Sequence, residues 1–305
     1  MRILECVPNI SEGRDQKKIA SIAEEVKKHK GVNLLDVSSD KDHHRSVITF
    51  LGEPAAVRKA ALSMAFRAIE LIDMREHRGA HPRLGAVDVV PFIPIQRVDM
   101  AEAVQVARDF GRELGRRGIP VFFYEEAAVR EERRELPTLR KGEYEGLAKK
   151  LKDPDWKPDE GPQVFNAKSG ATVVGARFPL VAYNVNLKTD NLSLAKEIAK
   201  KVRFKDGGFP NVRAMGVDLK EQKMVQVSMN LTNYQVTNIP IVYEFIKAEA
   251  LKKGIEIGES EIVGLIPLGV VEGLFKHYLR CPQFSIRQII EQRLLDRQVP
   301  RKPRP

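Results

Sequence analysis

The sequence contains few cysteines and no long hydrophobic run. Cys6 and Cys281 are the only cysteines in 305 residues and lie near opposite ends of the chain. This spacing excludes a disulfide framework and a cysteine-rich zinc site, so we expect both thiols to be small buried side chains. No apolar run approaches the roughly 20 residues that span a bilayer, and the stretch 1–8 is too short for a signal peptide. We therefore predict a cytoplasmic protein with no membrane partner.

Three common functional motifs are also absent. The chain has no phosphate-binding P-loop, no strand–glycine–helix dinucleotide fingerprint and no serine nucleophile elbow. A net charge of +10 would suit nucleic acid, but the basic residues are scattered and part of the excess lies in the tail 301–305. An anionic small-molecule substrate explains the charge equally well. We predict no nucleic-acid partner.

Hydrophobic periodicity predicts two lobes built from the same elements. A composition of 43% hydrophobic and 30% charged residues is that of a globular protein, and the length allows two lobes. The first lobe is predicted as strand 2–8, helix 16–29, strands 32–37 and 46–51, helix 54–72 and strand 87–95. The second is predicted as strand or hairpin 171–187, helix 192–203, strands 212–217 and 224–230, helix 239–252 and strand 255–263. Both follow the β-α-β-β-α-β order of the ferredoxin-like unit, so we predict an α+β fold with a pocket at the seam between two sheets.

Other elements surround these two lobes. We expect helices at 100–115, 139–151, 270–278 and 286–295, and a strand at 120–124. Ser11, followed by Glu12 and Gly13, marks the start of the first helix. The stretch 153–162 holds three prolines and a glycine, and is either a linker or an ordered binding loop. Trp156 favours order, because a large amphipathic ring is seldom left on a free linker. We divide the chain into 1–152, 153–170 and 171–305.

The loop after the second helix has the composition of a site. Residues 77–88 contain two histidines, two arginines and two glycines and run into an apolar strand. Imidazole and guanidinium together offer proton transfer and anion binding, although a solvated basic connection has the same composition. His77 and His81 are four residues apart, which suits a metal only on a helix, and Gly79 and Pro82 disfavour a helix there. We therefore predict no metal.

Three other segments carry polar chemistry. The stretch 8–14 follows a strand and opens a helix, where backbone amides attract anions or serve as an ordinary cap. The stretch 36–46 joins two strands and gathers carboxylates, histidines and Arg45, as a site or as a solvated hairpin. The amide-rich run 226–235 suits hydrogen bonds to a heterocycle but also suits capping.

Motifs along most of the chain resemble the formiminotransferase domain family, whose members in animals are fused to a cyclodeaminase. The resemblance extends to about Pro267, and the cyclodeaminase part is missing. The segment His81-Pro82-Arg83 is the specific one. The other matching segments are Glu5-Cys6-Val7-Pro8-Asn9, Ser11-Glu12-Gly13, Leu34-Leu35-Asp36-Val37, Arg45, Leu71-Ile72-Asp73-Met74, Gly85-Ala86, Asp88, Pro91-Phe92-Ile93-Pro94, Gly142-Glu143-Tyr144-Glu145, Gly170-Ala171-Thr172-Val173, Gly175-Ala176-Arg177 and Gln226-Val227-Ser228.

The resemblance implies a fold and a set of site residues. It implies two ferredoxin-like subdomains whose sheets face each other across a ligand tunnel, a homodimer, and tetrahydrofolate, free or polyglutamylated, as co-substrate without a metal. His81 is the implied catalytic residue. The implied folate-binding residues are Gly161, Pro162, Gln163, Val164, Phe165, Asn166, Ala167, Lys168, Ser169 and Gly170. The expected substrate contacts are Asn9, Asp40, Arg45, Arg78 and Arg83. Ser38 stands where relatives carry an acidic residue, and Asp40 or Asp42 are its possible substitutes.

The implied reaction belongs to histidine degradation and one-carbon metabolism. It moves the formimino group of N-formimino-L-glutamate to N5 of tetrahydrofolate and gives 5-formiminotetrahydrofolate and L-glutamate. One imidazole can take the proton from N5 and give a proton to the departing nitrogen. Three alternatives stay open: formyl transfer from 5-formyltetrahydrofolate to glutamate, a folate-binding protein without turnover, and a basic nucleic-acid-binding module.

Overall fold

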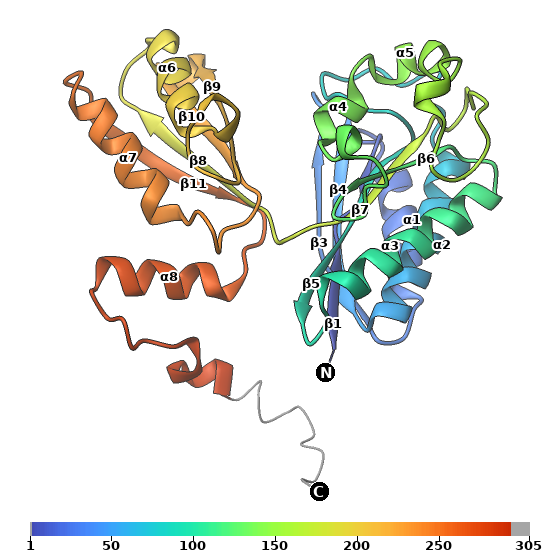
Figure 1. The fold of residues 1–305 in the computed structure, drawn as a ribbon, viewed down its shortest axis with the longest axis horizontal. Helices are drawn as coiled ribbons and strands as arrows, with labels where there is room; N and C mark the ends of the chain where they lie inside the picture. Colours follow the sequence, from blue (N-terminus) through green and yellow to red (C-terminus); the bar gives the residue numbers. More distant parts are fainter. Residues whose placement is uncertain (1, 294–305) are drawn as a thin grey trace, which may run out of the picture. The chain divides into compact units, whose positions relative to one another are not determined.

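The computed structural model describes residues 2–293, which form two compact units with their boundary between Arg177 and Phe178. Each unit is mixed α and β and holds one sheet (Figure 1). In the described part of the chain, no helix combines the length and the apolar character that crossing a bilayer requires.

The first unit contains a sheet of seven strands, three long helices and several short ones. Its strands are β1 (Ile3–Cys6), β2 (Asn9–Ile10), β3 (Val32–Asp40), β4 (Arg45–Gly52), β5 (Val87–Gln96), β6 (Val121–Glu125) and β7 (Thr172–Ala176). Its helices are α1 (Gln16–Lys27), α2 (Pro54–Leu71), α3 (Met100–Arg116), α4 (Leu136–Arg140) and α5 (Glu143–Lys150), with 3₁₀ turns η1 (Glu131–Arg133) and η2 (Pro154–Trp156). The predicted helix 139–151 is therefore two short helices, α4 and α5.

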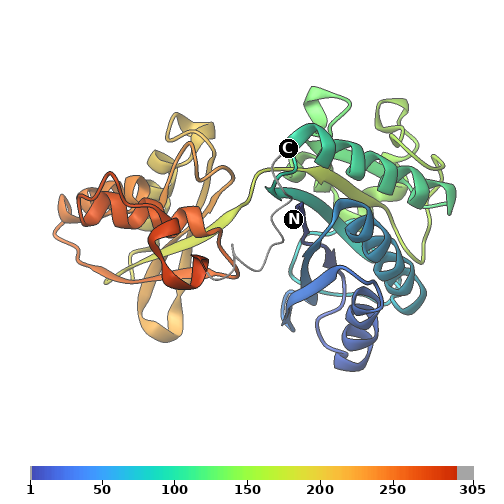
Figure 2. The ribbon, with the colours of Figure 1, turned by 90° about the horizontal axis from the view of Figure 1, so that it is seen from below.

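The first part of this sheet has the predicted β-α-β-β-α-β order. β3 pairs with β4, and β4 pairs with β1 and β2, which both also pair with β5, all antiparallel. The predicted strand 2–8 corresponds to β1, which ends at Cys6, and the short strand β2 follows directly after Pro8, which cannot donate to a ladder. Helices α1, α2 and α3 cover one face of the sheet (Figures 1 and 2).

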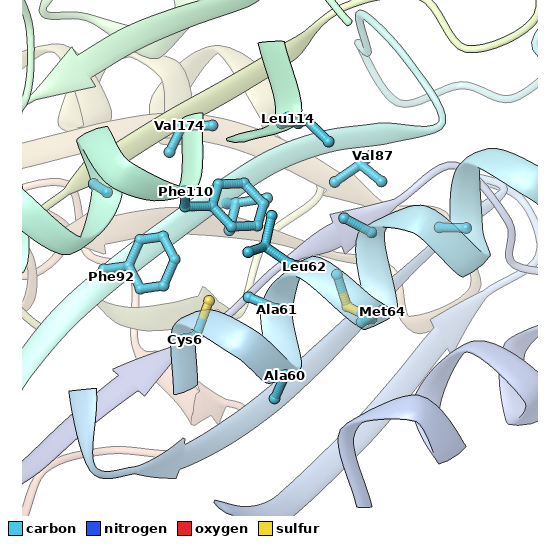
Figure 3. Close-up of a cluster of buried hydrophobic side chains, with 14 of the residues drawn as sticks. Cys6, Ala60, Ala61, Leu62, Met64, Val87, Phe92, Phe110, Leu114 and Val174 are labelled. Atoms are coloured by element: carbon cyan, nitrogen blue, oxygen red, sulfur yellow. The ribbon is translucent and has the colours of Figure 1, made fainter. Parts of the chain in front are cut away.

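The main core of the first unit lies between these helices and the sheet. Phe92 of β5 and Phe110 of α3 pack edge to face with ring centroids 5.5 Å apart (Figure 3). Cys6 of β1 and Met64 of α2 are fully buried in the same cluster. Cys6 thus confirms the expected buried thiol, whereas Cys281 is exposed, so that half of the prediction is wrong.

A second cluster joins the short helices to the end of the sheet. Leu139 of α4 and Leu147 of α5 pack with Phe122 of β6. Trp156 lies edge-on to Phe122, with ring centroids 6.3 Å apart, and Lys150 Nζ lies 4.2 Å from the centroid of its ring. Trp156 is therefore part of the first unit's packing.

Strand β7 differs most from the sequence prediction. We expected residues from 171 onward in the second lobe, but β7 lies in the first sheet, parallel to β5 and β6 and between them. It is fully buried on both faces, which is typical of a parallel strand. Its partners are distant in sequence, and periodicity carries no information about such pairing.

The second unit has a four-stranded antiparallel sheet in the order β11-β8-β10-β9. Its elements follow the predicted β-α-β-β-α-β order, and α6 and α7 contribute to one core with the sheet. The bounds are β8 (Val181–Leu187), α6 (Leu192–Val202), η3 (Phe204–Asp206), β9 (Val212–Leu219), η4 (Lys220–Gln222), β10 (Met224–Leu231), α7 (Ile239–Leu251), β11 (Ile257–Val263), α8 (Leu268–Tyr278) and η5 (Ile286–Gln288). The predicted helix 286–295 begins as the 3₁₀ turn η5, and its last two positions and the basic tail lie outside the described residues.

Candidate active site

The site is built on His81, which meets residues from two strands. Arg45, the first residue of β4, donates from Nη1 to His81 Nε2 at 2.8 Å and to Asn9 Oδ1 at 3.0 Å. Asn9 lies on β2, the neighbour of β4 in the sheet. All three side chains are partly exposed. The structure thus brings together the predicted catalytic residue and two of the predicted substrate contacts.

His81 is neutral, and its hydrogen bond fixes its tautomer. A guanidinium can only donate, so Nε2 of His81 accepts from Arg45 and the ring proton lies on Nδ1. Nδ1 is buried and has no hydrogen-bond partner among residues 2–293. Burial, followed by the charges of Arg45, Arg140 and His43, lowers the pKa of His81 to about 3. The ring can accept a proton at Nε2, but the lone pair of that nitrogen already accepts the hydrogen bond from Arg45.

A buried ion pair and an exposed hydrogen-bonded pair lie near this ring. Asp88 of β5 is 1% exposed and pairs with Arg140 of α4. His43 lies with its ring centroid 6.0 Å from that of His81, and its Nδ1 donates to Asp40 Oδ2 at 2.6 Å. The hydrogen bonds from the backbone and ring of His43 lower the pKa of Asp40. Asp40 is therefore linked to His81 indirectly, by its hydrogen bond to His43.

The two other predicted arginines line a separate hollow of about 500 Å³, together with Gly142, Glu143 and Glu145. Arg83 is 5% exposed and donates to Glu143 at 2.8 Å and to Glu145 at 2.8 and 2.5 Å. These carboxylates occupy the guanidinium fork that we had expected to bind the substrate. Arg78 is exposed and donates to backbone carbonyls. Of the two, Arg78 is the arginine with room for a ligand.

The predicted folate-binding stretch, residues 161–170, is joined to both ends of the histidine loop. Met74 donates its backbone N–H to the carbonyl of Lys168 at 2.8 Å, and Ala86 donates to the carbonyl of Ser169 at 2.8 Å. Asn166 side-chain oxygen accepts the backbone N–H of Lys168 and that of Ser169, both at 3.1 Å, which closes a turn. The two predicted site segments are therefore neighbours within the first unit.

This stretch also borders a hollow of about 310 Å³. Asn166, Lys168 and Ser169 line it, and the other lining residues are Phe66, Ile69, Glu70, Arg117 and Ile119. The Arg117 guanidinium lies 4.9 Å from the centroid of the Phe66 ring. The Ser169 hydroxyl is buried and has no hydrogen-bond partner in the described part of the chain. An apolar wall with two cations and a hydroxyl suits an anionic ligand with an aromatic body.

Sequence reasoning missed Arg140 as a neighbour of His81. Its position on α4 lies outside every segment that we had singled out. The available signal was Asp88, an acidic residue inside an apolar strand, because a buried carboxylate needs a positive partner. Residues 2–293 contain no group of three or more histidine, cysteine, aspartate or glutamate residues placed to hold a metal ion.

The fold and the site define a two-subdomain α+β protein with a neutral imidazole beside an arginine. Residues 3–177 match the family model described as the N-terminal subdomain of the formiminotransferase domain, and residues 182–299 match that described as the formiminotransferase domain. The chain belongs to the formiminotransferase domain family, as the sequence motifs indicated.

Proteins of known name resemble the chain over nearly its full length. It is 42% identical to the glutamate formimidoyltransferase of Streptococcus pyogenes, over 96% of this chain and 99% of that protein. It is 44% identical to the protein of the same name from Thermoplasma acidophilum, over 96% of this chain and 98% of that protein. It is 42% identical to the formimidoyltransferase-cyclodeaminase of Gallus gallus, over 93% of this chain but 54% of that protein. The match to the Gallus gallus protein thus covers about half of that relative.

Proposed function

We propose that this chain is a glutamate formimidoyltransferase, with tetrahydrofolate as co-substrate. Full-length similarity to two proteins of that name supports the activity. The observation that carries the mechanism is the neutral His81, whose Nε2 atom lies 2.8 Å from Arg45 Nη1. The site can accept a proton and hold an anion within one cluster of side chains.

The chemistry requires one proton to move twice. N5 of tetrahydrofolate attacks the formimino carbon of N-formimino-L-glutamate, and the new N–C bond replaces the bond from that carbon to the glutamate nitrogen. His81 Nε2 takes the proton that N5 loses and returns it to the glutamate nitrogen, so L-glutamate leaves. This general acid–base role is typically worth about 10² to 10⁴ in rate.

Arg45 prepares His81 for this role by moving to the substrate. A pKa of about 3 makes His81 a weak base while Arg45 donates to it. When a donor carboxylate pairs with Arg45, the positive charge beside the ring is neutralised, and the pKa of His81 rises towards the working pH. Asn9 and Asp40 help to orient the donor from β2 and β3, and Arg78 is a second carboxylate ligand. Arg83 acts through its hydrogen bonds to Glu143 and Glu145 and is not proposed to bind the donor.

Folate contacts and assembly follow from the family and are part of the proposal. The hollow beside Asn166, Lys168 and Ser169 supports the stretch 161–170 as a folate contact, because its two cations suit the glutamate end of folate and Phe66 suits an aromatic ring. We also propose that the protein acts in the cytoplasm as a homodimer, without metal or nucleic acid.

The test is a product assay with two donors. The purified chain is incubated with tetrahydrofolate and N-formimino-L-glutamate, or with 5-formyltetrahydrofolate and glutamate, and the folate products are separated. We expect 5-formiminotetrahydrofolate from the first pair only. Product from the second pair alone would identify a formyl transferase, and folate binding without product from either would identify a carrier.

The variant His81→Ala tests the assignment of the base. We expect kcat to fall by about 10² to 10⁴ while the Kd for tetrahydrofolate stays within about twofold. His277→Ala, at an exposed position on α8, is the matched control and should leave both unchanged. Turnover by His81→Ala at the wild-type rate would remove His81 from the mechanism.

A further inference from the structure

The two loops that carry Arg45 and His81 are held against each other at close range. Ala80 in the loop 77–81 donates its backbone N–H to the carbonyl of Asp42 in the loop 40–45, at 3.2 Å. Gly79 makes the approach possible, because a Cβ atom there would lie 2.4 Å from a backbone oxygen of the other loop. The geometry of the Arg45–His81 hydrogen bond therefore depends on how these loops are fastened.

His44 provides the first set of contacts that hold the two loops together. Its Nδ1 lies 2.9 Å from the carbonyl oxygen of Arg78, and its Nε2 lies 3.0 Å from Glu12 Oε1. Both oxygens are acceptors, so each ring nitrogen of His44 faces a hydrogen-bond acceptor. Burial raises the pKa of Glu12, but the backbone N–H groups of Arg14 and Asp15 and the His44 ring outweigh it, and the pKa is lowered overall. The lowered pKa favours the ionised form of the Glu12 carboxylate beside His44.

His77 provides the second set of contacts between the two loops. Its ring stacks on that of His44, with centroids 4.3 Å apart and planes 10° from parallel. Its Nε2 donates to the backbone carbonyl of His44 at 2.8 Å, and its Nδ1 accepts from Arg83 Nε at 3.2 Å. His77 is therefore neutral, and burial, His44 and Arg83 lower its pKa accordingly. The stack and this hydrogen bond join the loop 77–81 to the residue that precedes Arg45.

We propose that His77 is a positioning residue for the reaction: its stack on His44 and its hydrogen bond to the His44 carbonyl hold Arg45 in register with His81. This inference rests on the proposed function of His81. His44 directly precedes Arg45, so the carbonyl that His77 binds belongs to the peptide group that leads into Arg45. Arg83, held by Glu143 and Glu145, orients the His77 ring from its other nitrogen.

The contact of His77 with His44 matters because catalysis is sensitive to small shifts of the catalytic groups. His44 has a φ of 51°, in the left-handed region that a residue with a side chain adopts only at a cost in free energy. Without His77 that turn can relax, and Arg45 moves with it. A displacement of about 1 Å in a catalytic group can lower turnover by about a hundredfold.

Two substitutions separate the parts of the contact. His77→Gln keeps an N–H donor near the position of Nε2, whereas His77→Phe keeps an aromatic ring for the stack and has no donor. Thermal unfolding of each variant is measured first, and His77→Leu replaces the phenylalanine variant if that one does not fold. His277→Phe, at the exposed position on α8, is the matched control. For each protein, kcat, the Kd for tetrahydrofolate and the His81 ring titration by ¹⁵N NMR are measured.

We expect His77→Phe to lower kcat by about tenfold to a hundredfold with an unchanged folate Kd, and the His81 titration to move upward because Arg45 is no longer held beside it. His77→Gln should restore most of both. Wild-type kcat and an unmoved His81 titration in the folded phenylalanine variant would overturn the proposal, as would equal losses in both variants with that titration unmoved. If the wild-type chain forms no formimino product, the proposed function fails, while the titration still reports on positioning.

Discussion

Arg45 donates a hydrogen bond from Nη1 to Nε2 of His81 at 2.8 Å, so a cation occupies the lone pair that a general base must use. Burial of the ring is the largest cause of its lowered pKa, and Arg45 is the next. The pair is therefore a resting arrangement. Because the guanidinium charge is what a donor carboxylate would neutralise, substrate binding and the basicity of His81 are coupled through one side chain.

The variant Arg45→Met tests this coupling through pH. Removing the charge raises the pKa of His81 from about 3, while burial keeps it below the ordinary value. We expect the acid limb of the kcat/KM profile to move to higher pH, the KM for the donor to rise and kcat to fall. A ¹⁵N titration of the His81 ring provides the direct measurement.

Arg116→Met is the control for loss of one arginine, because Arg116 is exposed in the last turn of α3. It should leave the profile and the ring titration unchanged. If Arg45→Met titrates like the wild type, burial alone sets the basicity of His81 and the coupling is wrong.

Local patterns were sufficient for much of the fold. From α6 to β11 the second unit was predicted element by element, because β8 to β11 pair only with one another and each element carries its own periodicity. β7 could not be assigned this way, since its neighbours β5 and β6 are recruited from far along the chain. Ser11 shows the same limit at one residue: Asp15 caps α1, and the Ser11 hydroxyl donates to the carbonyl of Gly85.

The candidate site, like the fold, could be predicted from the sequence only in part. The composition of the loop 77–88 indicated a histidine and arginine site, and the family resemblance selected His81 within it. The partners of each arginine depend on tertiary contacts, so spacing could not show that Arg83 is held by Glu143 and Glu145 while Arg45 meets His81. His77 carried no distinguishing signal either, because its partner His44 is close in space and distant in sequence.

The lowered pKa of His81 also predicts a pH dependence of stability. Between pH 6.5 and 3 the unfolded chain binds a proton at this histidine and the native state does not, so the free energy of unfolding decreases as the pH falls. The contribution is fully present above pH 6.5. One such group changes the free energy by at most about 1.4 kcal/mol per pH unit. Urea unfolding of the wild type and of His81→Leu, from pH 7 to pH 5, should give a shallower dependence in the variant.

The remaining slope in His81→Leu is expected to come in part from His77, whose pKa is also lowered. Identical pH slopes in the wild type and the variant would show that His81 protonates equally in the native and unfolded states.

The two cysteines should differ sharply in reactivity. Cys281 is exposed, whereas Cys6 is fully buried and burial raises its pKa well above the ordinary value. Because the thiolate is the reactive form, we expect one thiol to react rapidly with a disulfide reagent in the native protein and the second only on unfolding. Cys281→Ser should abolish the fast phase. Two fast thiols in the native protein would contradict the burial of Cys6.

Gly170 connects the proposed folate stretch to the histidine loop and should not tolerate a side chain. Its φ is 67°, and a Cβ atom would lie 2.1 Å from the carbonyl oxygen of Leu84. Gly170→Ala must therefore strain the turn and push the two segments apart, and we expect a loss of about 1 to 3 kcal/mol in the free energy of unfolding. The Kd for tetrahydrofolate should rise as well, because Lys168 and Ser169 move with the turn. Gly146→Ala in α5 is the matched control: a Cβ there meets nothing within 4 Å, so the helix should gain up to about 1 kcal/mol. Equal denaturation midpoints for the two variants would show that the crossing at Gly170 is looser than the structure describes.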